Sequence, residues 1–150
     1  DWIGLALAYG AFVLDLDQPL NPLQIRLLAD SPAIAVVSPG AAPSVARSLI
    51  DGDAAVALGS GFSMTAGATC SMQAAALLAA RHGGLQLAEA ITLSTINAAH
   101  ALGIAAECGS LEAGKRADIL ILHVPDYRDI SNFLGVNLVS KIIQAGTLVS

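Results

Sequence analysis

The sequence predicts an α/β protein in which three strand–helix units form a parallel sheet and a small β unit follows. Short apolar runs alternate with helix-periodic segments through residues 1–103. The composition is 55% hydrophobic and 13% charged, with a mean hydropathy of +0.66. Strands and helices buried on both faces have such a composition. After Gly103 the sequence changes to glycine-rich turns and short strands.

The first strand–helix units are predicted from apolar runs and from the turn residues that end them. A short apolar run predicts a buried strand, and apolar side chains at a helical spacing predict a helix, as at Leu23, Leu27 and Leu28. Glycine, proline and aspartate then end the elements. In chain order, the predicted elements are a helix end at 2–9, a strand at 11–16, a helix at 23–29, a strand at 33–37, a helix at 43–50 and a strand at 55–59.

Helices are predicted to follow the third strand. The alanine-rich stretch 70–81 is closed by two glycines, and two further helices are expected at 87–93 and 96–102, the last capped by Gly103. Three strand–helix units cannot close an eight-stranded barrel, and open strand edges are unfavourable. The chain is therefore expected to be part of a larger fold.

The residues after the last helix predict a separate small β unit. A glycine-rich turn leads into a strand, and a hairpin with a turn at Ala145-Gly146 ends the chain. The three strands are expected at 118–124, 139–144 and 147–149. We therefore divide the chain into residues 1–108, with three strand–helix units, and residues 109–150, part of a small β domain.

Charge and composition exclude several classes of protein. The net charge is −5 and the seven Lys and Arg residues are scattered, so that nucleic acid is not an expected partner. No apolar run is long enough to span a membrane, and no signal peptide is visible. Cys70 and Cys108 are expected to be free thiols in a cytoplasmic protein. The apolar composition predicts a homo-oligomer or a complementary partner chain.

Two motifs resemble the amidohydrolase superfamily: "STINAAHALG" (94–103) and "GSLEAGKRADILIL" (109–122). In that superfamily such a helix ends the barrel, and such a turn leads to a small β domain. "VALGSGFSM" (56–64) and "DYRDISNFLGVNLVSKIIQAG" (126–146) are similar to segments of the imidazolonepropionase family. The resemblance implies the carboxyl-terminal strands and helices of a TIM-type (β/α) barrel plus part of a small β-sandwich domain.

The resemblance also implies an activity and its site. The family uses zinc or iron to hydrolyse a cyclic amide C–N bond, converting 4-imidazolone-5-propanoate to N-formimidoyl-glutamate in histidine degradation. Its acidic metal ligand in V-A-L-G-S/T-D-F-N-P matches Gly61, and the Asn of that motif matches Ser63. A gapless alignment on the family's D-H-L-E places Leu16 on the ligand His and Gln18 on the Glu. Gly61 and Leu16 offer no ligand, and Gln18 is neither an acid nor a base. We therefore expect no catalytic residue, no metal and no hydrolysis by this chain alone.

Two alternatives stay open. Asp15 and Asp17 share one face of a predicted strand end and form a weak candidate carboxylate site or general acid/base pair. We favour the simpler interpretation that one of them caps a turn and the other is solvated. The second alternative concerns function: the chain would be a non-catalytic, degenerate or split amidohydrolase module that binds a partner chain or a small-molecule ligand.

Overall fold

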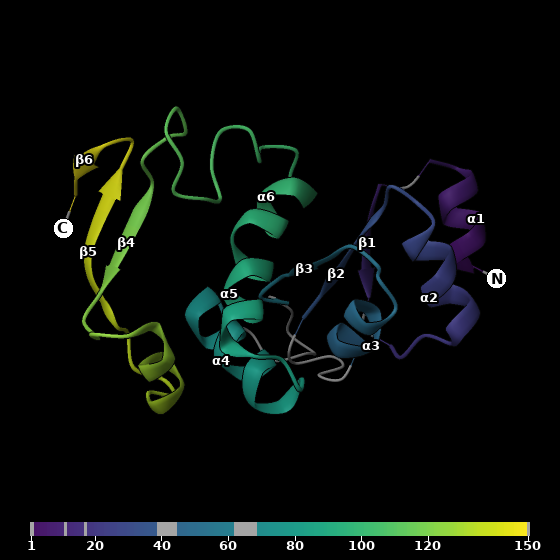
Figure 1. The fold of residues 1–150 in the computed structure, drawn as a ribbon, viewed down its shortest axis with the longest axis horizontal. Helices are drawn as coiled ribbons and strands as arrows, with labels where there is room; N and C mark the ends of the chain where they lie inside the picture. The colour runs from purple at the N-terminus through teal and green to yellow at the C-terminus, as the bar shows by residue number, and fades with distance from the viewer. Residues whose placement is uncertain (1, 11, 17, 39–44, 62–68, 150) are drawn as a thin grey trace.

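The structure is a computed structural model that describes residues 2–10, 12–16, 18–38, 45–61 and 69–149. A parallel sheet with its helices occupies one side of the view in Figure 1, and a small antiparallel sheet occupies the other. The elements, in chain order, are α1 (Trp2–Ala8), β1 (Val13–Leu16), α2 (Pro22–Ala29), β2 (Ile34–Val37), α3 (Val45–Asp51), β3 (Val56–Leu58), α4 (Met72–His82), α5 (Leu87–Ser94), α6 (Ile96–Ala101), β4 (Ile119–Leu122), the 3₁₀ helix η1 (Tyr127–Asn132), β5 (Val139–Gln144) and β6 (Thr147–Leu148).

The first three strands form a parallel sheet with the strand order β1-β2-β3. Along the chain, α2 lies between β1 and β2, and α3 lies between β2 and β3, as parallel neighbours require. The three predicted strands are confirmed, each one or two residues shorter than expected. α2 begins at Pro22 after a reciprocal cap, in which the side chains of Asn21 and Gln24 each accept the backbone N–H of the other.

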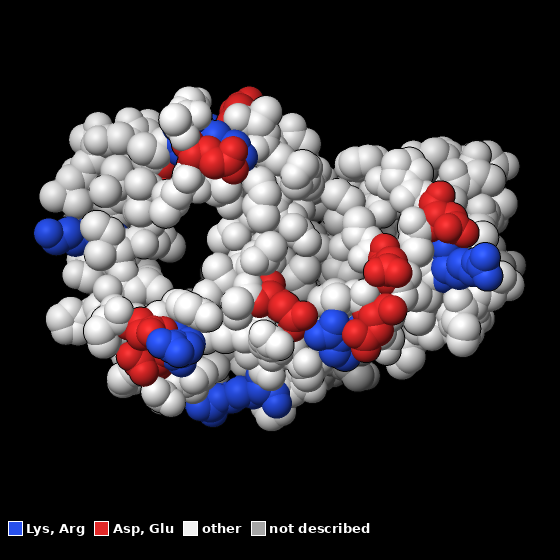
Figure 2. All heavy atoms as spheres, in the orientation of Figure 1, with Lys and Arg blue, Asp and Glu red and all other residues white. Residues whose placement is uncertain are grey.

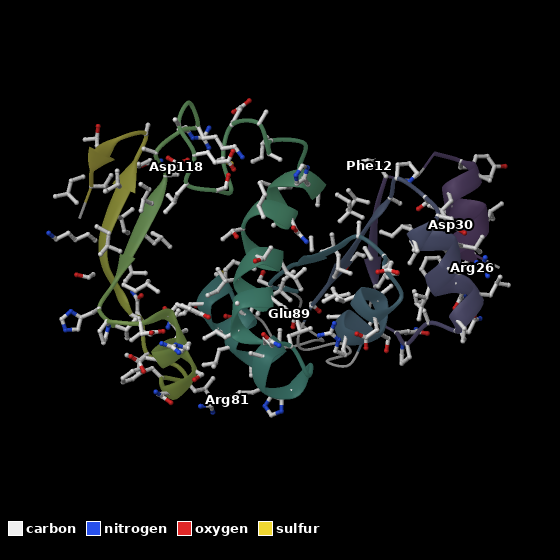
Figure 3. The ribbon with its side chains drawn as sticks, viewed as in Figure 1. Phe12, Arg26, Asp30, Arg81, Glu89 and Asp118 are labelled. Carbon is white, nitrogen blue, oxygen red and sulfur yellow. The ribbon has the colours of Figure 1, made fainter. Side chains whose placement is uncertain are left out.

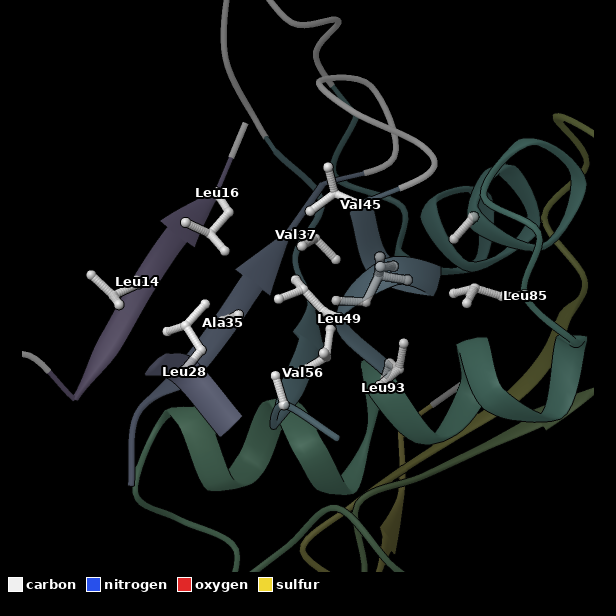
Figure 4. Packing of buried hydrophobic residues seen from close by; sticks show 14 of the residues in the cluster. Leu14, Leu16, Leu28, Ala35, Val37, Val45, Leu49, Val56, Leu85 and Leu93 are labelled. Carbon is white, nitrogen blue, oxygen red and sulfur yellow. The ribbon is translucent and has the colours of Figure 1, made fainter. Parts of the chain in front are cut away.

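One face of the parallel sheet packs against helices and forms the core (Figure 4). The strand register sets Leu14 beside Ala35 and Ala35 beside Val56, and it sets Leu16 beside Val37. Paired residues on neighbouring strands point to the same face, so these side chains form one apolar layer. Helix side chains complete the cluster, among them Leu28, Val45, Leu49 and Leu93.

Polar contacts fix the ends of the helices that follow the parallel sheet. At the start of α4, the Ser71 hydroxyl accepts the N–H of Ala74. At the start of α5, the Glu89 carboxylate accepts the N–H of Gln86 at 2.7 Å. The same carboxylate accepts hydrogen bonds from Arg47 in α3, with N–O distances of 3.1 Å to each oxygen. Arg47 therefore ties α3 to α5.

The small sheet is antiparallel with the strand order β4-β5-β6. Its predicted hairpin is confirmed: Ala145 and Gly146 turn the chain at φ of 48° and 81°. The Asp118 carboxylate accepts the N–H of Ala145 at 2.8 Å, which holds this strained turn. Large apolar side chains are exposed on both faces of the sheet, since consecutive strand residues point to opposite faces. The exposed residues of β4, β5 and β6 include Leu120, Ile121, Ile142 and Leu148.

The segment between β4 and β5 is held on α4 at two points. The Gln73 side chain donates to the carbonyl of Val136 at 2.8 Å and accepts the N–H of Leu138 at 3.2 Å. Further along the same helix, the Arg81 guanidinium donates to the carbonyl of Ser131. Figure 2 shows a hollow between the small sheet and the helices, so that the sheet meets the rest of the molecule mainly at its two ends.

The charged side chains in Figure 2 lie mostly as neighbouring pairs of opposite sign, and no single basic patch covers this face. The paired side chains include Arg26 with Asp30, Arg47 with Asp51, and Arg128 with Asp126. Exposed pairs of this kind contribute little to stability.

Among the described residues, no helix combines the length and the apolar character that a bilayer crossing requires.

Candidate functional site

The predicted site positions belong to the carboxyl ends of the three parallel strands. These ends lie at the same edge of a parallel sheet, where enzymes of α/β architecture place their chemistry. The structure describes four of the predicted positions, namely Asp15, Leu16, Gln18 and Gly61. The other two, Asp17 and Ser63, lie outside the described residues.

Leu16, the last residue of β1, is a core residue. Its side chain is 2% exposed and belongs to the apolar cluster between the sheet and the helices, with Val37 and Val45 (Figure 4). A leucine has no donor atom for a metal, and the side of the sheet that it faces is filled with apolar groups. In this structure the position contributes packing.

Asp15 lies on the opposite face of β1 from Leu16 and is exposed. Its neighbour across the sheet is Val36, whose side chain offers neither charge nor a hydrogen bond. Gln18 is also exposed. The candidate carboxylate site of Asp15 with Asp17 is not tested, because Asp17 is not among the described residues.

Gly61 follows β3 in the left-handed region of the backbone, with φ of 62°, which favours glycine. A Cβ atom built at this position would lie 2.4 Å from the Cβ and 2.6 Å from the Oγ of Ser38. Ser38 directly follows β2 and is the one polar residue among those described that is buried, at 8% exposure. Position 61 therefore has no room for a side chain while Ser38 keeps its place.

The described residues do not form a metal site. No three His, Cys, Asp or Glu side chains in that part of the chain come together closely enough to hold an ion. A catalytic zinc takes three protein ligands from nitrogen, oxygen or sulfur atoms. Leu16 and Gly61 supply none, so the zinc or iron that the sequence resemblance implies does not fit the described strand ends.

The shifted pKa values belong to structural contacts. The N–H of Gln86 lowers the pKa of Glu89, and the Arg47 guanidinium lowers it further; Figure 3 shows Glu89 on its helix. The hydrogen bond from Arg128 lowers the pKa of Asp126 to about 2. Each carboxylate is thereby held in its charged form, whereas a general acid or base needs a pKa near the working pH.

A groove of about 500 Å³ lies beside β3, an edge strand of the parallel sheet. Ala55 and Gly59 bond to β2 through their backbones, so the carbonyl of Val56 points to the free edge. The Asn97 side chain donates to that carbonyl at 2.7 Å and so holds α6 against the edge. The residues lining the groove are Ile50, Asp53, Ala54, Ala55, Val56, Ala88, Glu89, Thr92, Leu93 and Asn97.

Two residues of structural importance were not singled out from the sequence. Asn97 lies inside the motif "STINAAHALG", so this motif could have indicated that the residue is important. Ser38 gave no signal, because its contact with position 61 depends on how β2 and β3 are paired.

A family model described as "Amidohydrolase family" matches residues 33–149. The chain belongs to the amidohydrolase family. An imidazolonepropionase from Geobacillus kaustophilus is 39% identical, over 97% of this chain and 36% of the relative. One from Deinococcus deserti is 40% identical, over 97% of this chain and 38% of the relative. The motif-based resemblance is thus confirmed: this amidohydrolase chain is imidazolonepropionase-like and spans little more than a third of these relatives.

Solved structures agree on the fold of this amidohydrolase chain. A zinc-bound adenosine deaminase from Xanthomonas campestris superimposes with a TM-score of 0.79 at 20% identity, over 91% of this chain and 36% of that one. A guanine deaminase from E. coli gives a TM-score of 0.75 at 18% identity, over 97% of this chain and 41% of that one. At such low identity, these similarities establish the fold alone.

Proposed function

We propose that the chain is the carboxyl-terminal part of an imidazolonepropionase-like amidohydrolase and that it does not hydrolyse substrate alone. The observation behind this proposal is the 39–40% identity over 97% of the chain, which covers only 36–38% of each relative. In this proposal, the parallel strands β1, β2 and β3 are the last three of a TIM-type barrel. The antiparallel sheet is then part of the small β-sandwich domain.

The reaction of the parent family would be hydrolysis of a cyclic amide C–N bond, here 4-imidazolone-5-propanoate to N-formimidoyl-glutamate. Such hydrolysis needs an activated water and a group that moves a proton to the leaving nitrogen. The described strand ends offer the core residue Leu16, the neutral amide of Gln18 and the bare backbone of Gly61. None of these can perform either step, which supports inactivity of the chain alone.

A second function, a non-catalytic module that binds a partner chain, is favoured by the surfaces left open. A groove lies beside the edge strand β3, where Asn97 of α6 covers only part of the edge, and the small sheet exposes leucine and isoleucine on both faces. Open strand edges and exposed apolar sheets are surfaces that proteins cover by association. The partner would be a second copy of this chain or a complementary chain. A small-molecule ligand, a cytoplasmic location and the lack of a nucleic-acid partner stay predictions.

The test is an activity assay on the purified 150-residue chain. We expect no loss of 4-imidazolone-5-propanoate above the metal-only blank, with zinc or iron supplied in turn. Turnover that rises in proportion to chain concentration would contradict the proposal. Light scattering on the same sample tests association: we expect a mass above one chain, and a monomer with a cooperative melt would contradict the partner-binding function.

A further inference from the structure

Two residues meet where β2 and β3 end, although they are far apart in sequence. The register pairs Val37 with Leu58, so the residues that follow the two strands emerge side by side. Ser38 comes directly after β2, and Gly61 comes shortly after β3. Their proximity is therefore a consequence of the parallel pairing and involves no residue outside those described.

The contact leaves no volume for a second side chain. An ideal Cβ at position 61 would lie 2.4 Å from the Cβ of Ser38, far inside normal van der Waals separation. Rotation of the hydroxyl would relieve only the 2.6 Å approach to Oγ, because the Cβ of Ser38 is fixed by its own backbone. One of the two strand ends would have to move to admit any residue larger than glycine.

We propose that Ser38 and Gly61 are a coupled pair, in which Ser38 excludes every side chain from position 61. The pair closes the carboxyl end of β3 to a metal-ligating group. The absence of a carboxylate there is then a property of two strand ends together, and replacing Gly61 alone cannot reverse it. This inference concerns shape and stability, so it holds or fails independently of the proposed function.

The experiment compares thermal unfolding of the chain and four variants. Gly103→Ala is the matched control, because Gly103 has a similar φ of 73° but no atom within 4 Å of its Cβ position. It therefore measures the backbone cost of leaving glycine without any steric contact. The test variants are Gly61→Ala, Ser38→Gly, and the two combined.

We expect Gly61→Ala to lower the melting temperature by roughly 2 to 12 °C more than Gly103→Ala does, the range expected for overpacking in a chain of this size. In the Ser38→Gly background, the further loss caused by Gly61→Ala should shrink to that of the control. An equal effect of Gly61→Ala and Gly103→Ala would overturn the proposal. A loss that is unchanged by Ser38→Gly would overturn it as well.

If Gly61→Ala does not fold, the soluble yield of the double variant takes the place of its melting temperature. Recovery of folded protein when Ser38→Gly is added supports the coupling. Failure of the double variant to fold, while Ser38→Gly alone folds, would overturn it.

Discussion

Leu49→Ala tests whether the described core holds the chain together. Leu49 lies in α3, is fully buried, and packs with the side chains of the parallel sheet in the apolar cluster of Figure 4. The substitution removes three carbon groups, which at about 0.8 kcal/mol each gives about 2.4 kcal/mol of lost transfer free energy. The cavity left behind adds to this loss, so we expect the free energy of unfolding to fall by about 2 to 5 kcal/mol in total.

The assay is urea unfolding followed by circular dichroism, with Leu23→Ala as the matched control. The control makes the same leucine-to-alanine substitution in helix α2, at a side chain that is 63% exposed. We expect the control to change the free energy of unfolding by less than about 0.5 kcal/mol. The slope of free energy against urea should stay the same in both variants, which makes the midpoints directly comparable.

Equal midpoints for Leu49→Ala and Leu23→Ala would refute the reasoning, because Leu49 would then not lie in a packed core. A wild-type chain that unfolds without a cooperative transition would refute it too. In that case, the core between the parallel sheet and its helices would not suffice to hold this chain folded.

Three further predictions follow from polar contacts. Asn97→Ala removes the donor to a β3 carbonyl and should lower the free energy of unfolding by about 1 to 2 kcal/mol, whereas an unchanged urea midpoint would mean that water replaces the amide. Gln73→Ala should speed hydrogen exchange at the N–H of Leu138, and exchange as slow as in the wild type would contradict the contact. Arg128→Gln should raise the pKa of Asp126 from about 2 toward 3.8 in an NMR titration. Because the pKa of Asp126 is lower in the folded chain than in the unfolded chain, the contact with Arg128 stabilises the wild-type fold above pH 3.8. This stabilisation is lost as the pH falls toward 2. A wild-type titration near 3.8 would contradict that assignment.

Most of the fold could be predicted because its elements are local in sequence. Apolar runs and turn residues located all three parallel strands, and Ala145-Gly146 located the hairpin. The helix η1 was missed, because it begins with a local contact in which the Asp126 side chain accepts the N–H of Arg128. Such a turn gives no periodic apolar pattern, which is the signal that sequence analysis reads.

The site was less predictable because it depends on orientation. Alignment could place Leu16 at a strand end, but its burial against helices follows from the pleat of β1 and its pairing with Val37. The crowding of position 61 by Ser38 similarly requires the register of β2 and β3. A one-residue shift in that register would turn these side chains to other faces, and composition does not encode the register.

The two contacts along α4 have a mechanical consequence. A segment attached at one point can rotate in any direction, whereas attachment at two separated points leaves only rotation about the line that joins them. Gln73 and Arg81 are eight residues apart, about 12 Å along the helix axis. Their side chains form hydrogen bonds with opposite ends of the stretch from Ser131 to Leu138. One residue inserted between Gln73 and Arg81 would rotate one of these side chains by about 100° around the helix axis relative to the other, and its hydrogen bond would break. The spacing of Gln73 and Arg81 on α4 thus fixes how the segment between β4 and β5 lies along this helix.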